Sequence, residues 1–308
     1  MEKQRNSTIP KSFFGNVFSL LKRTFQEWLQ DKAPQLGAAL AYYTVFSLAP
    51  LVLVLLAIVG FIFRDDPAGA WNKITQHMSY FLDQSAVQVV QNIAEKASQP
   101  GKGLTATIIG IALALFGASG VFGQLQDALN TIWGVKAKPG KSIWRFLRVR
   151  FLSFAMVGGI CFLLLVSLTI ESALKGFSHY VQSVLPGGIV LAMTVYLIFD
   201  FVVVVLFFAF IFKFLPDVKI LWNDVWLGAV MTAVFFGIGK WALGLYLGSG
   251  AAGSAYGAAS SLITLLLWVY YSSQILLFGA EFTQVYADEA GREFKPSEYA
   301  VQIETAGS

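Results

Sequence analysis

The 308-residue chain is more apolar than a soluble domain, with 56% hydrophobic, 15% aromatic and only 13% charged residues, against about 25% charged in an ordinary soluble protein. Its net charge of +4 does not indicate nucleic-acid binding, because lysine and arginine collect in the cytoplasmic loops of membrane proteins. The composition therefore excludes the soluble classes and predicts a membrane protein.

Six apolar stretches are each long enough to cross a bilayer, because a spanning helix needs about 20 residues at 1.5 Å per residue. They cover residues 37–63, 104–123, 151–170, 187–212, 225–248 and 258–280. Backbone inside lipid must satisfy its own hydrogen bonds, so these stretches are expected to be helical. The predicted fold is an all-α, polytopic membrane protein. We expect a cytoplasmic arm at 1–35, a six-helix membrane domain at 36–287 and a polar cytoplasmic tail at 288–308.

The arm before the first span carries one helical stripe of large apolar residues: Phe14, Phe18, Leu21, Phe25 and Trp28. Lys22 and Arg23 lie off this stripe. A basic, aromatic amphipathic helix of this kind either lies in the inner membrane interface or packs against the cytoplasmic ends of the bundle.

The loop at 64–103 is also patterned, with two apolar helical stripes. The first contains Trp71, Ile74, Met78, Phe81 and Leu82, and the second contains Val87, Val90, Ile93, Ala94 and Ala97. We expect two short amphipathic helices that rest on the outer membrane face or cap the bundle.

The distribution of basic residues predicts that both termini lie in the cytoplasm. With that orientation, sixteen lysines and arginines are cytoplasmic and five are outside, as the positive-inside rule requires. The first apolar run is too long for a cleaved signal peptide, and we expect it to act as an uncleaved signal-anchor. The single cysteine, Cys161, rules out a disulfide within one chain.

Small residues recur at steps of four in the second and fifth spans. They are Gly110, Ala114 and Ala118, then Ala229, Ala233 and Gly237, followed by Gly244 and Gly248. Such faces allow close helix approach in lipid, either within one chain or across a homo-oligomer interface.

Two charged residues fall deep inside predicted spans, Asp200 in the fourth and Lys240 in the fifth. A charge at that depth costs roughly 2.5–3.5 kcal/mol on insertion scales, so it should have a partner. Their depths differ by about 5 Å at 1.5 Å per residue, which a lysine can bridge. The two residues either line a substrate path or form a structural pair, or Lys240 extends outward to the interface.

Helix 1 adds polar groups next to a proline. Pro50 cannot donate to the carbonyl of Phe46, so a kink is predicted there, and kinked helices often build binding sites in transporters. We expect Tyr43 and Ser47 to line a polar cavity with Asp200 and Lys240. The alternative is a dry bundle in which these groups satisfy one another.

Two further features bear on chemistry. Glu281 is expected at the inner boundary of the sixth span, where a carboxylate costs little. His77 and His179 are the only histidines, and no metalloprotease, serine-triad or nucleotide-loop motif is present. We therefore expect no enzyme and no cofactor or metal.

Several segments together resemble the YihY/virulence factor BrkB family. They are QLGAALAYYTVFSLAP at 35–50, LQDALNTIWGV at 125–135, KFLPD at 213–217, and the closing signature from AYGAASS at 255–261 through LWVYY at 267–271 to GAEF at 279–282. The resemblance covers about residues 32–287. It implies a six-helix protein of the bacterial inner membrane. The family's older label, ribonuclease BN, is not transferred, because these residues offer no site for that chemistry.

The sequence thus predicts a protein that moves or flips a lipid or amphiphilic anion without ATP hydrolysis. Its expected partners are membrane lipids and that lipid or anionic substrate, not nucleic acid. The alternative is a structural scaffold in envelope assembly, and a membrane-embedded enzyme is a third option. A charge-lined cavity favours transport, whereas a bundle filled by aromatic side chains favours scaffolding.

Overall fold

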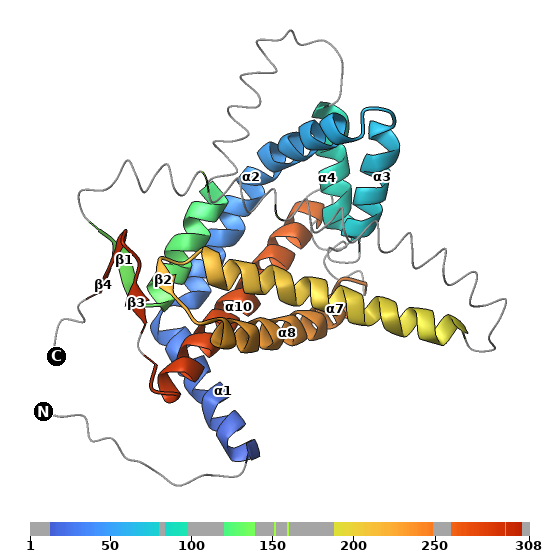
Figure 1. The fold of residues 1–308 in the computed structure, drawn as a ribbon. Helices are drawn as coiled ribbons and strands as arrows, with labels where there is room; N and C mark the ends of the chain where they lie inside the picture. Colours follow the sequence, from blue (N-terminus) through green and yellow to red (C-terminus); the bar gives the residue numbers. More distant parts are fainter. Residues whose placement is uncertain are drawn as a thin grey trace, which may run out of the picture.

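The computed structural model describes residues 13–79, 84–97, 120–138, 151, 159, 188–248, 260–292 and 294–303. These residues are mostly helical (Figure 1). The helices are α1 (Phe13–Gln30), α2 (Ala33–Ile62), α3 (Pro67–Met78), α4 (Gln84–Ala97), α7 (Gly188–Phe214), α8 (Trp222–Gly248) and α10 (Ser260–Glu289). One further helical segment covers residues 120–132.

Three helices in the described part are long and apolar enough to cross a membrane. The candidate spans are Leu197–Phe214, Trp222–Leu245 and Leu262–Glu289. The predicted first span falls within the continuous helix α2. The predicted spans at 104–123 and 151–170 lie outside the described residues, apart from 120–123, 151 and 159, so the total of six remains a prediction.

Helix α10 is the centre of the described bundle. It packs against α2 on one side and α8 on another, and it also contacts α1 and α4, while α7 packs on α8. Leu277 and Ala280 of α10 are fully buried in one core with Phe212 of α7 and Val225 of α8. This core also includes Leu129 of the 120–132 segment.

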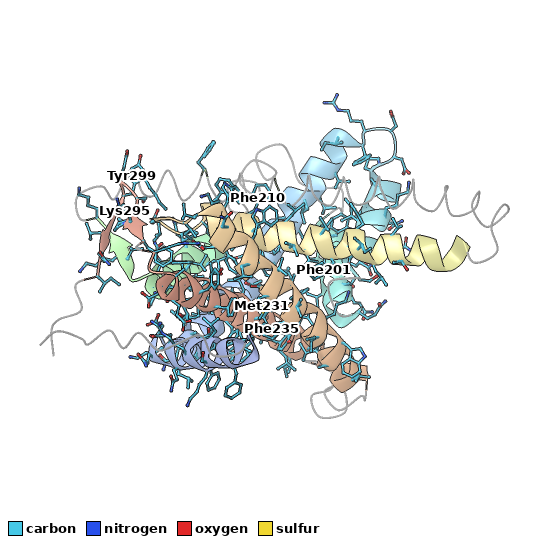
Figure 2. All side chains as sticks on the ribbon, turned by 60° about the horizontal axis from the view of Figure 1, so that its bottom comes forward. Phe201, Phe210, Met231, Phe235, Lys295 and Tyr299 are labelled. Atoms are coloured by element: carbon cyan, nitrogen blue, oxygen red, sulfur yellow. The ribbon has the colours of Figure 1, made fainter. Side chains whose placement is uncertain are left out.

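Aromatic rings fill the space between α7, α8 and α10. Phe208 stacks on Phe212 and meets Phe236 edge-on with ring centroids 5.7 Å apart, and Phe236 in turn meets Trp268. Phe235, which Figure 2 labels, forms a similar edge-on pair with Phe278, with ring centroids 5.7 Å apart. Large offset or edge-on rings pack densely, so aromatic side chains fill much of this part of the interior.

Helix α1 covers most of the apolar stripe of the predicted arm, whose cytoplasmic position stays a prediction. Its Thr24 is fully buried and Trp28 packs on the main core, because α1 lies along α10 and α2. Phe18 and Phe25 of the stripe instead stay 73% and 51% exposed. The helix therefore packs with one side and leaves Phe18 and Phe25 exposed on another, where Phe25 stacks on Trp28 with ring centroids 5.7 Å apart.

Helices α3 and α4 lie where two amphipathic helices were predicted in the 64–103 loop. Val90 and Ala94 of α4 are buried against Val52 of α2, and Ile74 of α3 packs on Val59. These helices cap the bundle at the end called here the α3–α4 end (Figure 1). Phe81 and Leu82 lie outside the described residues.

The small-residue pattern of the fifth span is confirmed only in its first half. Ala229 and Ala233 of α8 are buried in the core, whereas Gly237 and Gly244 have no neighbour within 4 Å of an added Cβ. Helices α8 and α10 approach closely at Gly228, which lies against Thr283, at Gly239, which lies against Tyr271, and at Gly279, which lies against Thr232. The small residues of the second span lie outside the described part.

Four short strands form a region that the all-α expectation did not include. Strand β1 (Val135–Ala137) pairs with β4 (Ala300–Gln302), and β2 (Val218–Lys219) pairs with β3 (Lys295–Pro296), both antiparallel. The predicted polar tail is therefore partly folded: residues 294–303 join the loop after the 120–132 segment to the α7–α8 loop. Lys295 and Tyr299 lie in this region (Figure 2). We call this end of the bundle, with α1 and the last turns of α10, the strand end.

Candidate functional site

The structure places Asp200 of α7 close enough to Lys240 of α8 for Coulombic attraction between them. Both side chains are half-buried. They meet because α7 and α8 pack side by side. A short turn joins the end of α7 to the start of α8, so the two helices run in opposite directions. The sequence prediction that these two residues approach each other agrees with this placement, while their function stays a prediction.

Large apolar side chains surround the pair on α7 and α8. Leu197 and Phe201 are 58% and 39% exposed, and Ile238 and Trp241 are 58% and 69% exposed. A half-buried charge pair within such an apolar surface can interact with a polar group inside the membrane, where lipid tails offer no polar partner.

Helix α2 carries the other predicted site residues, and they are placed differently. The Ser47 hydroxyl is buried and donates to the backbone carbonyl of Tyr43 at 2.7 Å, one turn before the carbonyl that Pro50 leaves without a donor. Tyr43 is 43% exposed and lies beside Gly120 of the 120–132 segment. The helix runs unbroken through Pro50, whose side chain is outside the described part.

The two halves of the predicted cavity belong to different helix pairs. Helix α10 packs extensively on both α2 and α8, whereas α2 makes no comparable contact with α7 or α8 among the described residues. The cavity shared by Tyr43, Ser47, Asp200 and Lys240 therefore remains a prediction, and the charge pair is the part of it that the geometry brings together.

Glu281 differs from its expected place at a helix end. Helix α10 continues to Glu289, and Glu281 is fully buried beneath the turn between α1 and α2. Its position at the membrane boundary stays a prediction. The structure adds that α1 folds back along α10 and covers this carboxyl, which no local pattern around residue 281 reveals.

At the strand end, a buried polar pair was missed from the sequence. Asn130 and Asp217 are both buried. The Asn130 side-chain amide donates to the Asp217 carboxylate at 3.0 Å, and the Asp217 backbone amide donates to the Asn130 side-chain oxygen at 2.8 Å. Both residues stand in the segments 125–135 and 213–217 that carry the family resemblance, and that resemblance was the available signal.

Two ion pairs also connect elements at this end. Arg292 pairs with Asp224, which is only 1% exposed, and Arg23 of α1 pairs with Asp288 of α10, where both side chains are more than a third exposed. Between them is a cavity of about 540 Å³. Its lining includes Arg23, Glu27, Trp133, Asp288 and Phe294, so it contains both signs of charge.

The described residues contain no group of three or more histidine, cysteine, aspartate or glutamate side chains that could hold a metal ion. His77 lies on α3, and His179 and Cys161 fall outside the described residues.

Comparison with known proteins gives a consistent family match. The family described as Virulence factor BrkB matches residues 24–303. The chain is 30% identical over 287 residues to a UPF0761 membrane protein of Albidiferax ferrireducens, covering 90% of this chain and 64% of that protein. It is 29% identical to a UPF0761 membrane protein of Psychrobacter sp. strain PRwf-1, covering 91% of this chain and 50% of that protein.

A UPF0761 membrane protein of Tolumonas auensis is 25% identical, with 91% of this chain and 89% of that protein covered. The chain thus spans from half to about nine-tenths of the length of these relatives. No solved structure matches.

Proposed function

Because this chain belongs to the virulence factor BrkB family of membrane proteins, we propose that it moves or flips a lipid or an amphiphilic anion across the bacterial inner membrane, without ATP hydrolysis. The observation that supports this function is the charge pair of Asp200 and Lys240, half-buried on two apolar, membrane-length helices. A polar headgroup that crosses lipid needs charged partners at depth, and such residues commonly mark substrate paths.

The aromatic packing of the interior favours an amphiphilic substrate over a fully polar solute. Aromatic rings close the space between α7, α8 and α10, whereas the charge pair lies among exposed apolar side chains at the edge. A headgroup at this edge meets Asp200 and Lys240 while its tails stay in lipid.

Purified protein in lipid vesicles tests the proposal. We expect it to accelerate the inward movement of a headgroup-labelled phospholipid, measured by quenching of the outer leaflet, or the efflux of an amphiphilic anion. Lys240→Met and Asp200→Asn should slow this movement at least about tenfold, the factor that corresponds to about 1.4 kcal/mol in a barrier.

Lys73→Met is the matched control, because Lys73 lies exposed on α3, away from the charge pair. Vesicles with wild-type protein that move lipid and anion no faster than protein-free vesicles contradict the proposal. If Lys240→Met and Asp200→Asn both keep the wild-type rate, the charge pair has no part in the transport.

A structural scaffold is the second candidate. The aromatic filling of the bundle and the interlocked strands of the strand end support it, because both rigidify the molecule. This function predicts inert vesicles together with an envelope defect when the protein is deleted from cells, and a defect that Lys240→Met fully rescues.

A further inference from the structure

Glu281 is a buried acid that the proposed headgroup path does not use. Its side chain has no exposed area, and apart from one neighbouring acid neither carboxyl oxygen has a hydrogen-bond partner among the described residues. Burying an ionised carboxylate without donors or a cation is strongly unfavourable, and the usual outcome is that the group keeps its proton.

The group that faces Glu281 is another acid, Asp31, in the turn between α1 and α2. Two carboxyl groups can form a hydrogen bond only when one of them carries a proton and donates it. Burial raises the pKa of Asp31, and the nearby Glu27 carboxylate raises it further, while the hydrogen bond with Glu281 acts in the opposite direction. The contact between the two acids therefore requires a proton.

Among the described residues, the other charged groups of α1 and α2 bring no cation to Glu281. On α1, Glu27 acts on Glu281 as a second negative charge, and Arg23 pairs with Asp288 of α10 and, at 3.7 Å, with Glu27. Helix α2 has no charged side chain, and Lys32 before it is exposed.

The remaining packed elements also bring no cation to Glu281. Of the charged residues of α8, Asp224 pairs with Arg292 and Lys240 interacts with Asp200. Asp127 of the 120–132 segment and Glu289 of α10 are exposed, and α4 packs on α10 at the α3–α4 end (Figure 1).

A metal ion does not fit this cluster. Glu27, Asp31 and Glu281 are not arranged so that three of their carboxyl groups could hold one ion, since no described group of three such residues could. A shared proton satisfies the facing pair without further ligands, as in other carboxyl dyads.

We propose that Glu281 and Asp31 share one proton in a site closed by α1, and that this site couples the transport proposed above to a proton gradient. The coupling to a proton gradient rests on the proposed function, whereas the shared proton of Glu281 and Asp31 does not. When α1 separates from α10, water reaches Glu281, the ionised carboxylate becomes hydrated, and the proton passes to water. When α1 closes, the site takes a proton again.

Carbodiimide labelling tests the site without any transport assay. Hydrophobic carbodiimides react with protonated carboxyl groups in apolar surroundings. In purified wild-type protein at pH 7 we expect one modified site, mapped to Glu281 by peptide mass spectrometry, with loss of the label as the pH is raised. Absence of label at Glu281, or the same labelling at pH 7 and at pH 10, overturns the proposal.

Three variants sharpen the result. Glu281→Gln should abolish the label, and Glu289→Gln, an exposed acid on the same helix, should leave it unchanged. Asp31→Asn should reduce it severalfold, because an amide can donate to an ionised Glu281 and remove the need for the proton. Full labelling in Asp31→Asn overturns the shared pair, and the wild-type measurement stands even if Glu281→Gln does not fold.

Vesicles with an imposed pH gradient test the coupling. The gradient should accelerate substrate movement by wild-type protein severalfold and have no effect in Glu281→Gln. Equal acceleration in both overturns the coupling. If wild-type protein moves no substrate at all while Glu281 is labelled as expected, the proposed function fails and the proton site stands.

Discussion

Individual charged residues at the strand end differ in energetic weight because they differ in burial. Asp224 is 1% exposed and has Arg292 as its partner, whereas Arg23 and Asp288 are largely open to water. Removing one partner of a buried pair leaves an uncompensated charge, while exposed pairs contribute little.

We therefore expect Arg292→Met to lower the free energy of unfolding by about 3–5 kcal/mol and Arg23→Met by about 0–1 kcal/mol. Reversible unfolding in mixed detergent micelles measures both. Equal losses in the two variants contradict the assignment of Asp224 as a buried, dependent charge.

The Asp200–Lys240 pair makes a separate prediction about coupling. Asp200→Asn leaves a half-buried lysine and Lys240→Met leaves a half-buried aspartate, so each single variant should destabilise the protein more than the double variant does. A double-mutant cycle on unfolding free energies checks this. Simply additive losses contradict a direct interaction.

At this scale the sequence locates isolated charges but not their surroundings. Asp200 and Lys240 stand out because charge is rare in spans, and helix geometry predicts their similar depth. The burial of Glu281 and the contact of Asn130 with Asp217, 87 positions apart, depend on how distant segments fold together. Local periodicity contains no information on such contacts.

Among the elements, α8 and α10 approach closely at three glycines, Gly228 and Gly239 of α8 and Gly279 of α10. A Cβ at Gly228 would overlap the Thr283 side chain, whereas a Cβ at Gly237 on the same helix meets nothing within 4 Å. Gly228→Ala should therefore cost about 1–3 kcal/mol of unfolding free energy through overpacking.

Gly237→Ala is the matched control. It should be neutral or stabilise by up to about 1 kcal/mol, because alanine is the better helix former. Thermal unfolding of both variants in the same detergent compares them, and equal destabilisation argues against the close contact at Gly228.

Helix α1 packs on α10 and α2 with one side and exposes aromatic residues on another. Its orientation toward the membrane can therefore be measured. The exposed Phe18 is expected to enter the membrane interface, and Gln30, which is also exposed, to face water. Nitroxide labels on Phe18→Cys and Gln30→Cys, in a Cys161→Ser background, should show higher oxygen accessibility at 18 and higher accessibility to a water-soluble relaxant at 30. The reverse order excludes this orientation of the helix.

The elements predicted best from sequence are those with strong periodicity or long apolar runs. The bounds of α1, α3, α4, α7 and α8 follow the predicted stretches within a few residues. The end of α10 was placed nine residues early, because the apolar run stops at 280 while packing against α1 keeps the following turns helical. The short strands were missed because each is two or three residues long and depends on a partner far along the chain.

At the scale of the whole molecule, the two ends of the bundle carry different charges. The basic residues of the strand end are Lys22, Arg23, Lys32, Lys136, Lys138, Lys213, Lys219, Arg292 and Lys295, and those of the α3–α4 end are Arg64, Lys73 and Lys96. The positive-inside rule places the richer end in the cytoplasm. The segments of the strand end must lie on the same side of the membrane, because β3 and β4 in residues 294–303 pair with β2 and β1.

The orientation can be measured with two cysteines at exposed positions, again in a Cys161→Ser background. Gln88→Cys lies on α4, and Glu298→Cys lies between β3 and β4. In intact cells a membrane-impermeant maleimide, supplied once the outer membrane is permeabilised, should label position 88 and leave position 298 unlabelled until the inner membrane is lysed. Labelling at 298 but not at 88 in intact cells would show that the molecule has the opposite orientation in the membrane. The α1 face and the Glu281 site would then lie outside, where the proton gradient acts on them from the opposite side.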